Sequence, residues 1–179
     1  MKYIAILRGI NVSGQKSIKM VDLKHLFESQ GLNNIVTYIQ SGNVIFECAK
    51  QPNDEIRKTI EKAIVEKYGF EVPVCIRSYS QWKNVIASNP LKEYSSSEND
   101  TKLLVTFLSG TATAEKQKKL HEYVKAPEEL CVNKTEVYLY CPGGYGRSKL
   151  INTFVEDKLG VTATTRNWKS VLKIAELAG

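Results

Sequence analysis

The sequence predicts an α+β protein made of two similar domains in tandem. Its 179 residues follow twice the order strand, helix, strand, strand, helix, strand, helix. A Trp-Lys-polar-Val-aliphatic stretch opens the last helix each time, at residues 82–86 and 168–172. The order βαββαβ is typical of the ferredoxin-like fold, whose sheet runs 4-1-3-2 with both helices on one face. We therefore expect two ferredoxin-like domains, each followed by an extra helix. One mixed α/β sheet that holds all the strands is the alternative.

The first copy alternates short β-prone runs with amphipathic ones. Apolar residues recur at helical spacing over residues 20–30, and again between Pro52 and Gly69. The small pair Ser41-Gly42 predicts a tight hairpin. A short extra helix is expected over residues 80–89, and the expected strands are residues 3–8, 35–40, 43–48 and 72–77.

The second copy follows the polar run 95–100, which indicates a linker. Thr113 can cap one helix, and the apolar stripe of another ends at Gly160. Strands are expected at residues 103–108, 129–133, 136–141 and 161–164, before the helix of Trp168. The predicted domains are residues 1–92 and 101–179, with the linker at about 93–100.

Composition indicates an ordinary globular protein of the cytoplasm. Apolar residues make up 42% and charged residues 25% of the chain, which suits a packed core. The apolar run in the opening MKYIAILRGI is too short for a signal peptide and is expected to form a strand, and no stretch approaches the roughly 20 apolar residues that span a bilayer. Four cysteines without a Cys-x-x-Cys pair are expected to be structural, and two isolated histidines predict no metal site. We expect no cofactor and no membrane partner, and the oligomeric state stays open.

Positive charge gathers near the first strand. The net charge of +6 favours anionic partners, and the first 24 residues hold five cations and one acid. In the expected topology, the end of strand 1 meets the hairpin of strands 2 and 3, so residues 8–17 lie beside residues 40–43. Glycines there let backbone amides approach a ligand. The expected ligand-binding residues are Arg8, Asn11, Ser13, Lys16, Gln40, Ser41 and Asn43.

A second cluster is expected where the third and fourth strands of the second domain end. Residues 141–149 and 164–168 are both expected to be loops that lead into helix N-termini, which favour anions. The expected ligand-binding residues here are Arg147, Lys149, Thr165, Arg166 and Asn167. Each loop residue also has an ordinary structural explanation, since glycines make turns and Ser, Thr or Asn cap helices and hairpins.

Known catalytic motifs do not match. Gln15 separates Gly14 from Lys16, so the loop fails the phosphate-loop pattern G-x-x-x-x-G-K-[ST], and nucleoside triphosphate hydrolysis is not expected. Nothing places a nucleophile near either histidine, so no catalytic residue is assigned. Tyr138 and Tyr140 alternate on a strand as base-stacking aromatics do in RNA-recognition motifs. Burial under the Trp168 helix or the other domain is the preferred interpretation of these tyrosines.

Three segments together resemble a known family. AILRGINVSG, VTYIQSGNVIF and ATTRNW are similar to the LRGINVGG, YIQSGN and TTRNW motifs of the bacterial family called domain of unknown function 1697. The resemblance spans almost the whole chain, with Ser13 where many members have glycine. It implies a small cytosolic protein of tandem ferredoxin-like architecture without an assigned activity. Because its motifs coincide with the loops above, it also suggests that these loops form the functional surface.

Three functions stay open from the sequence. The first is a binding protein that holds a phosphate-bearing ligand, either a nucleotide or a nucleic-acid backbone, through Arg8, Lys16, Arg147 and Arg166. The second is an enzyme for a small anionic metabolite, in which Arg8 or Arg166 holds the anion and Tyr38 or a serine transfers a proton. The third is a protein–protein interaction module that uses its open sheets.

Overall fold

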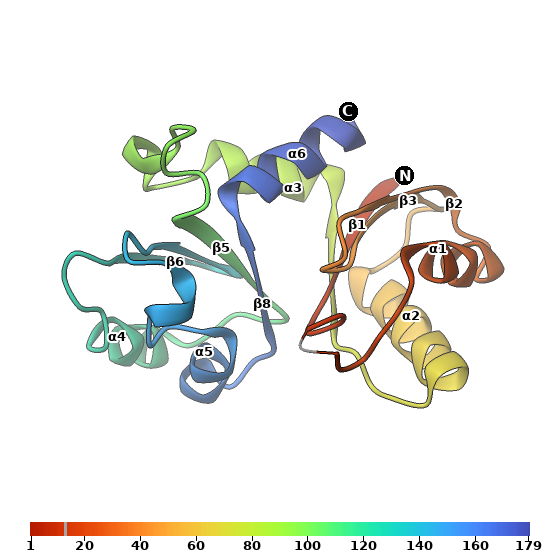
Figure 1. The fold of residues 1–179 in the computed structure, drawn as a ribbon, viewed down its shortest axis with the longest axis horizontal. Coiled ribbons are helices and arrows are strands. Elements are labelled where there is room, and N and C mark those ends of the chain that lie inside the picture. The colour runs from red at the N-terminus through yellow and green to blue at the C-terminus, as the bar shows by residue number, and fades with distance from the viewer. Residues whose placement is uncertain (13) are drawn as a thin grey trace. The chain divides into compact units, whose positions relative to one another are not determined.

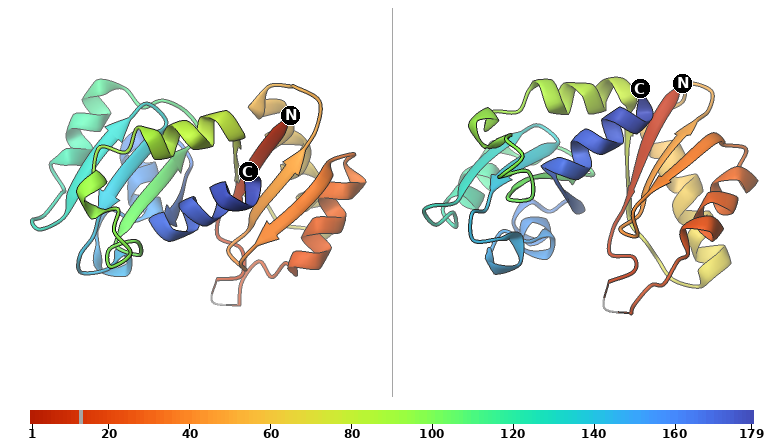
Figure 2. Two further views of the ribbon diagram at one scale, coloured as in Figure 1. Left: turned by 90° about the horizontal axis from the view of Figure 1, so that it is seen from above. Right: turned by 45° about the horizontal axis from the view of Figure 1, so that its top comes forward.

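Two four-stranded sheets and six α-helices form the described part of the chain, which in this computed structural model is residues 1–12 and 14–179 (Figures 1 and 2). The elements follow the order β1 (Lys2–Leu7), α1 (Met20–Ser29), β2 (Asn33–Tyr38), β3 (Asn43–Glu47), α2 (Asn53–Tyr68), β4 (Val74–Ser78), α3 (Tyr79–Ala87), η1 (Lys92–Tyr94), β5 (Leu103–Leu108), α4 (Ala114–His121), β6 (Glu129–Asn133), β7 (Glu136–Tyr140), η2 (Tyr145–Arg147), α5 (Asn152–Leu159), β8 (Ala163–Asn167) and α6 (Trp168–Ala178).

Both sheets have the same strand order. The first sheet runs β2-β3-β1-β4 and the second runs β6-β7-β5-β8. Every neighbouring pair is antiparallel. This is the order that the βαββαβ pattern predicts for each copy. The strands therefore form two separate sheets and not the single mixed sheet of the alternative prediction.

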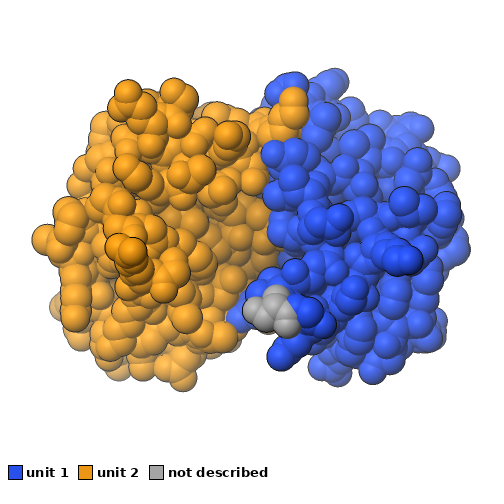
Figure 3. Space-filling view, viewed as in Figure 1, with its two compact units in different colours: residues 1–84, 174–179 blue, residues 85–173 orange. Residues whose placement is uncertain are grey.

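The chain divides into two compact units (Figure 3). Unit 1 consists of residues 1–84 and 174–179, and unit 2 consists of residues 85–173. The chain passes from unit 1 to unit 2 within α3 and returns within α6. Each extra helix thus contributes residues to both units.

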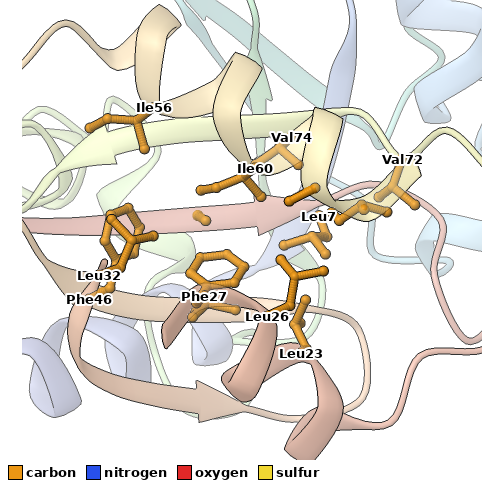
Figure 4. Packing of buried hydrophobic residues seen from close by; sticks show 14 of the residues in the cluster. Leu7, Leu23, Leu26, Phe27, Leu32, Phe46, Ile56, Ile60, Val72 and Val74 are labelled. Atoms are coloured by element: carbon orange, nitrogen blue, oxygen red, sulfur yellow. The ribbon is translucent and has the colours of Figure 1, made fainter. Parts of the chain in front are cut away.

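The core of unit 1 lies between its sheet and helices α1 and α2 (Figure 4). Tyr3, Ala5 and Leu7 of β1 belong to this core, whereas Ile4 and Ile6 lie on the opposite face of the strand. All five side chains are at most 2% exposed. Burial on both faces explains why β1 is a continuous apolar run.

In unit 2, the two tyrosines of β7 pack against other residues of the same unit. Leu139 belongs to the core that α4 and α5 cover, and Tyr138 points to the opposite face. Tyr138 is 1% exposed, and this burial raises the pKa of its hydroxyl group. The hydroxyl donates to the Val85 carbonyl at 2.8 Å. Tyr140 stacks on Tyr94 with 3.7 Å between ring centroids. Tyr138 is therefore buried, as the preferred interpretation holds, whereas Tyr140 is only partly buried. Their partners Val85 and Tyr94 belong to α3 and η1 of unit 2, and not to the Trp168 helix or the other domain as expected.

The tryptophan repeat is shifted between the two copies. Opposite β1, Arg77 pairs with Ile4, and the corresponding pair in unit 2 is Arg166 with Val105. Trp168 follows Arg166 by two residues, whereas Trp82 follows Arg77 by five. The difference of three residues is close to one helical turn, so the Trp-Lys stretch begins about one turn further from the start of α3 than from the start of α6.

Candidate functional site

The end of β1 and the β2–β3 turn meet at one edge of the first sheet, which we call the unit 1 rim (residues 8–12, 14–19 and 39–42). The Leu7 amide donates to the Gly42 carbonyl at 2.8 Å. Antiparallel pairing of β1 with β3 requires this meeting. The predicted convergence of the two segments is therefore confirmed, while their role in binding stays a prediction.

Asn11 fastens the two parts of the rim to each other. Its Nδ2 donates to the carbonyl oxygens of Ile18 at 2.9 Å and Gln40 at 2.8 Å. Its Oδ1 accepts from the Ile18 amide at 2.9 Å. With φ at 56°, Asn11 has a left-handed conformation that asparagine tolerates better than most residues. Because both its amide protons and its oxygen bond within the protein, Asn11 shapes the loop.

Left-handed backbone is concentrated in the unit 1 rim. At Gly42, φ is 80°, and an added Cβ would lie 2.8 Å from Leu7 Cβ and 2.7 Å from Ile10 Cδ1. Ile39 has φ at 50° although it is β-branched, and such a residue is an outlier at positive φ. Turns of this kind orient backbone amides into concavities that bind anions. The rim residues with positive φ are Gly9, Asn11, Gly14, Lys16, Ile39 and Gly42.

Two basic side chains of the predicted site belong to this rim. Arg8 is partly buried and Lys16 is exposed. The Lys16 Nζ donates to the Glu71 carbonyl at 2.6 Å. An ammonium group has three donors, so this contact holds the Lys16 ammonium group in place without using all its donor capacity. Ser13, another predicted residue, lies outside the described residues.

The β2–β3 turn carries the other predicted residues of unit 1. Asn43 is fully buried, and its Nδ2 donates to the Tyr38 carbonyl at 3.0 Å and to Ser41 Oγ at 3.2 Å. Gln40 is exposed, and its carbonyl accepts from Asn11. Asn43 therefore stabilises the hairpin, and Gln40 is the more accessible of the two amide side chains.

In unit 2, the structure corrects the prediction that residues 164–168 form a loop. The strand β8 covers Ala163–Asn167 and pairs with β5 along its whole length. Arg166 is thus a strand residue that is only 8% exposed. Its Nη1 donates to Thr164 Oγ1 at 3.1 Å and to the Thr165 carbonyl at 2.8 Å. The β-branched threonines favour strand geometry, which extends β8 beyond the expected end at residue 164.

A cluster of hydroxyl groups joins the two predicted segments of unit 2. The Thr165 hydroxyl lies 2.6 Å from Asn152 Oδ1, 2.7 Å from Thr106 Oγ1 and 3.1 Å from the Tyr145 hydroxyl. An amide oxygen only accepts, so Thr165 donates to Asn152 while Thr106 and Tyr145 donate to Thr165. These bonds tie residues 141–149 to β8.

The other predicted residues of unit 2 differ in what they contact. The Asn167 Oδ1 accepts from the Ser170 amide at 2.9 Å and caps α6. The Lys149 Nζ lies 4.5 Å from the Tyr123 ring centroid, a cation–π distance. Arg147 is exposed on η2. The structure therefore joins Thr165 to residues near Tyr145 but engages Lys149 and Asn167 in packing and capping.

Sequence reasoning missed Ile39 in the first cluster, and Thr106, Tyr145 and Asn152 in the second. The pair Ser41-Gly42 predicted a two-residue hairpin, whereas the turn between the paired Tyr38 and Asn43 has four residues, in which Ile39 and Gly42 are left-handed. No local pattern marks Ile39 as a left-handed residue. The hydroxyl cluster depends on contacts between distant segments, which no spacing reveals.

Neither a metal centre nor a transmembrane helix emerges from the described residues. Within residues 1–12 and 14–179, no three His, Cys, Asp or Glu side chains gather as ligands for a metal ion. No helix in this part of the chain combines the length and apolarity needed to cross a bilayer.

Comparison with known proteins identifies the family. The sequence profile of a protein family of unknown function, DUF1697, matches residues 1–138, so the chain belongs to this family. The match includes the two motifs of the unit 1 rim. A solved structure of a conserved bacterial protein from Streptococcus pneumoniae is 19% identical, with a TM-score of 0.79 over 99% of this chain and 98% of that one. This likeness concerns the fold alone. No curated protein sequence matches the chain significantly.

Proposed function

We propose that the unit 1 rim binds a phosphate-bearing ligand. The observation that carries this proposal is the length of the rim. Between β1 and α1 the chain uses residues 8–19, whereas the corresponding connection of unit 2, between β5 and α4, needs only residues 109–113. Long connections on a rigid scaffold are where binding residues tend to lie.

The chemistry of the rim suits an anion. The Lys16 ammonium group and the Arg8 guanidinium supply positive charge, and left-handed turns favour concavities of backbone amides. The amides of Asn11, Gln15 and Gly42 already donate to carbonyls within the rim. In this proposal, other amides of the rim and Lys16 donate to phosphate oxygens, and Gln40 and Ser41 supply further polar groups. The second predicted site, in unit 2, stays a prediction. Strand pairing, helix capping and ring contacts already engage several of its residues, which are Arg147, Lys149, Thr165, Arg166 and Asn167.

We also infer that each unit is a ferredoxin-like fold and that the two copies are a tandem repeat. The shared strand order and shared element order support this inference. The predicted domains, residues 1–92 and 101–179, differ from the two compact units because residues 85–92 belong to unit 2 and residues 174–179 to unit 1. Four free cysteines support a cytoplasmic location, since disulfides are rare there.

Calorimetric titration with pyrophosphate tests the binding proposal. Lys16→Ala should weaken binding about fivefold or more, because a charge-assisted contact is lost. Lys134→Ala is the matched control: Lys134 is exposed and left-handed at φ 53°, but it belongs to the β6–β7 turn of unit 2. Added salt should weaken binding to the wild type, since exposed charges are screened. Absence of binding at millimolar pyrophosphate, or equal losses in both variants, contradicts the proposal.

A further inference from the structure

Ile39 is an exposed apolar residue held in an unfavourable backbone conformation. Its φ of 50° brings the Cβ of a β-branched residue too close to the backbone, yet 47% of the residue is exposed. Burial in the core therefore does not explain why isoleucine occupies this position. Glycine or asparagine would suit the conformation better. Backbone strain of this kind is found preferentially at functional sites.

The other left-handed residues of the described chain differ from Ile39. Those that are not glycine are polar or charged: Asn11, Lys16, Asn34 and Lys134. Among the described residues, Ile39 is thus the one apolar side chain at positive φ. An apolar group in that position requires a reason beyond the turn itself.

A second exposed apolar side chain lies at the same junction. The Asn11 side chain donates to the Gln40 carbonyl, and Val12 and Ile39 are the direct chain neighbours of these two residues. Val12 is 58% exposed. Two residues with exposed apolar side chains are therefore direct chain neighbours of the pair that joins the two parts of the rim, and one of them, Val12, is also close in sequence to the cationic Lys16.

We propose that the phosphate-bearing ligand is a mononucleotide whose base lies against Ile39 and Val12. The proposal rests on the proposed function of the rim, and it adds the class of ligand. A nucleotide combines phosphate oxygens, which suit the amides and Lys16, with a flat ring whose face gains from apolar contact. Inorganic phosphate or a sugar phosphate has no group that would use Ile39.

The decisive comparison is between AMP and ribose 5-phosphate, which carry the same phosphate monoester and differ by the base. Calorimetry on the wild type should give at least about tenfold tighter binding of AMP. Ile39→Gly should reduce this ratio to about twofold or less, because the apolar contact is lost. The same variant should unfold at a higher urea concentration than the wild type, since glycine relieves the strain. Higher stability with weaker binding of the base is the result expected of a residue retained for its ligand.

Asn34→Gly is the control, because Asn34 has φ at 51° in β2 of the same unit and the change leaves the charge unaltered. It should keep the full AMP preference.

Equal binding of AMP and ribose 5-phosphate to the wild type overturns the nucleotide proposal and leaves the phosphate site intact. An AMP preference that survives in Ile39→Gly overturns the role of Ile39. Failure of AMP, ribose 5-phosphate and pyrophosphate alike overturns both proposals. Binding of a single-stranded oligonucleotide about a hundredfold more tightly than AMP, with a steep salt dependence, overturns the mononucleotide class in favour of nucleic acid.

Discussion

The two units join their strands at the corresponding edge with the same hydrogen bonds but with different connections. In unit 1, the Leu7 amide donates to the Gly42 carbonyl at 2.8 Å; in unit 2, the Leu108 amide donates to the Thr135 carbonyl at 2.8 Å. A second bond of 2.9 Å is also repeated, from Arg8 to Pro73 and from Ser109 to Thr162. We call residues 109–113 and 134–135 the unit 2 rim. The sheet is thus completed equally well by short connections, so the fold does not require the longer rim of unit 1.

The first helix of each unit shows the same contrast. Thr113, which precedes α4, accepts from the Lys116 amide and caps that helix as the sequence predicts. Lys19 occupies the equivalent position before α1, where the described residues provide no side-chain cap. The short connection of unit 2 thus includes a side-chain cap for the helix that follows it. The connection of unit 1 gives up such a cap and adopts left-handed conformations, as expected where function competes with stability.

Gly42→Ala should have the largest effect on this comparison. The new Cβ would clash with Leu7 and Ile10 at less than 3 Å and would also strain a residue at φ 80°. Overpacking and the left-handed penalty together should lower the free energy of unfolding by about 2–4 kcal/mol. Urea denaturation measures this change.

The matched control is Gly110→Ala in the unit 2 rim. Its Cβ would meet only Val161 Cγ1, at an ordinary 3.6 Å. The change should alter stability by less than about 0.5–1 kcal/mol. Similar losses of unfolding free energy in Gly42→Ala and Gly110→Ala would show that the two rims are packed alike, and would contradict the difference between them.

Asn11→Ala should have the next largest effect. It removes three hydrogen bonds and leaves the Ile18 and Gln40 carbonyls without this partner, a loss of about 2 kcal/mol. Amide hydrogen exchange should accelerate at Ile18. In unit 2, Gln117→Ala removes the single bond from Nε2 to the Ala112 carbonyl, at 2.8 Å, and should cost about 0.5–1.5 kcal/mol. A larger loss in Gln117→Ala than in Asn11→Ala would reverse the assignment of Asn11 as the residue that fastens the rim.

Much of the fold could be predicted because local patterns agree with tertiary structure. The helix predicted between Pro52 and Gly69 is α2, Asn53–Tyr68, and Gly69 ends it in a left-handed conformation at φ 74°. The strand β5 has the predicted bounds. The predicted bounds of β8 were wrong because Thr165 and Arg166 are polar. The Thr165 hydroxyl bonds to Thr106 of the distant strand β5, and the Arg166 guanidinium donates to its neighbours Thr164 and Thr165 within β8. Local polarity therefore indicated a loop where pairing with β5 forms a strand.

The candidate site was predictable only as far as topology determines it. Antiparallel pairing was sufficient to bring residues 8–17 to the β2–β3 turn. It could not tell that the Asn43 side chain would be buried in the hairpin, or that Ile39 would be left-handed. Both features depend on how a particular turn closes, and a turn of four residues can close in several ways.

The smallest effect concerns pH and should separate the two units. In unit 2, the Tyr94 hydroxyl donates to Glu129 Oε1 at 2.5 Å, and this bond with the carboxylate raises the pKa of Tyr94 to about 12. The neutral phenol is favoured in the folded state, so the contribution to stability is complete below pH 10 and is lost as the pH rises from 10 to about 12. Tyr94→Phe should remove this part of the pH dependence. Hydrogen exchange at β6 amides should show the difference between wild type and variant over this range, whereas exchange in the unit 1 rim should not. An ultraviolet titration in which Tyr94 ionises near its ordinary pKa of 10 would mean that the bond to Glu129 does not persist in solution.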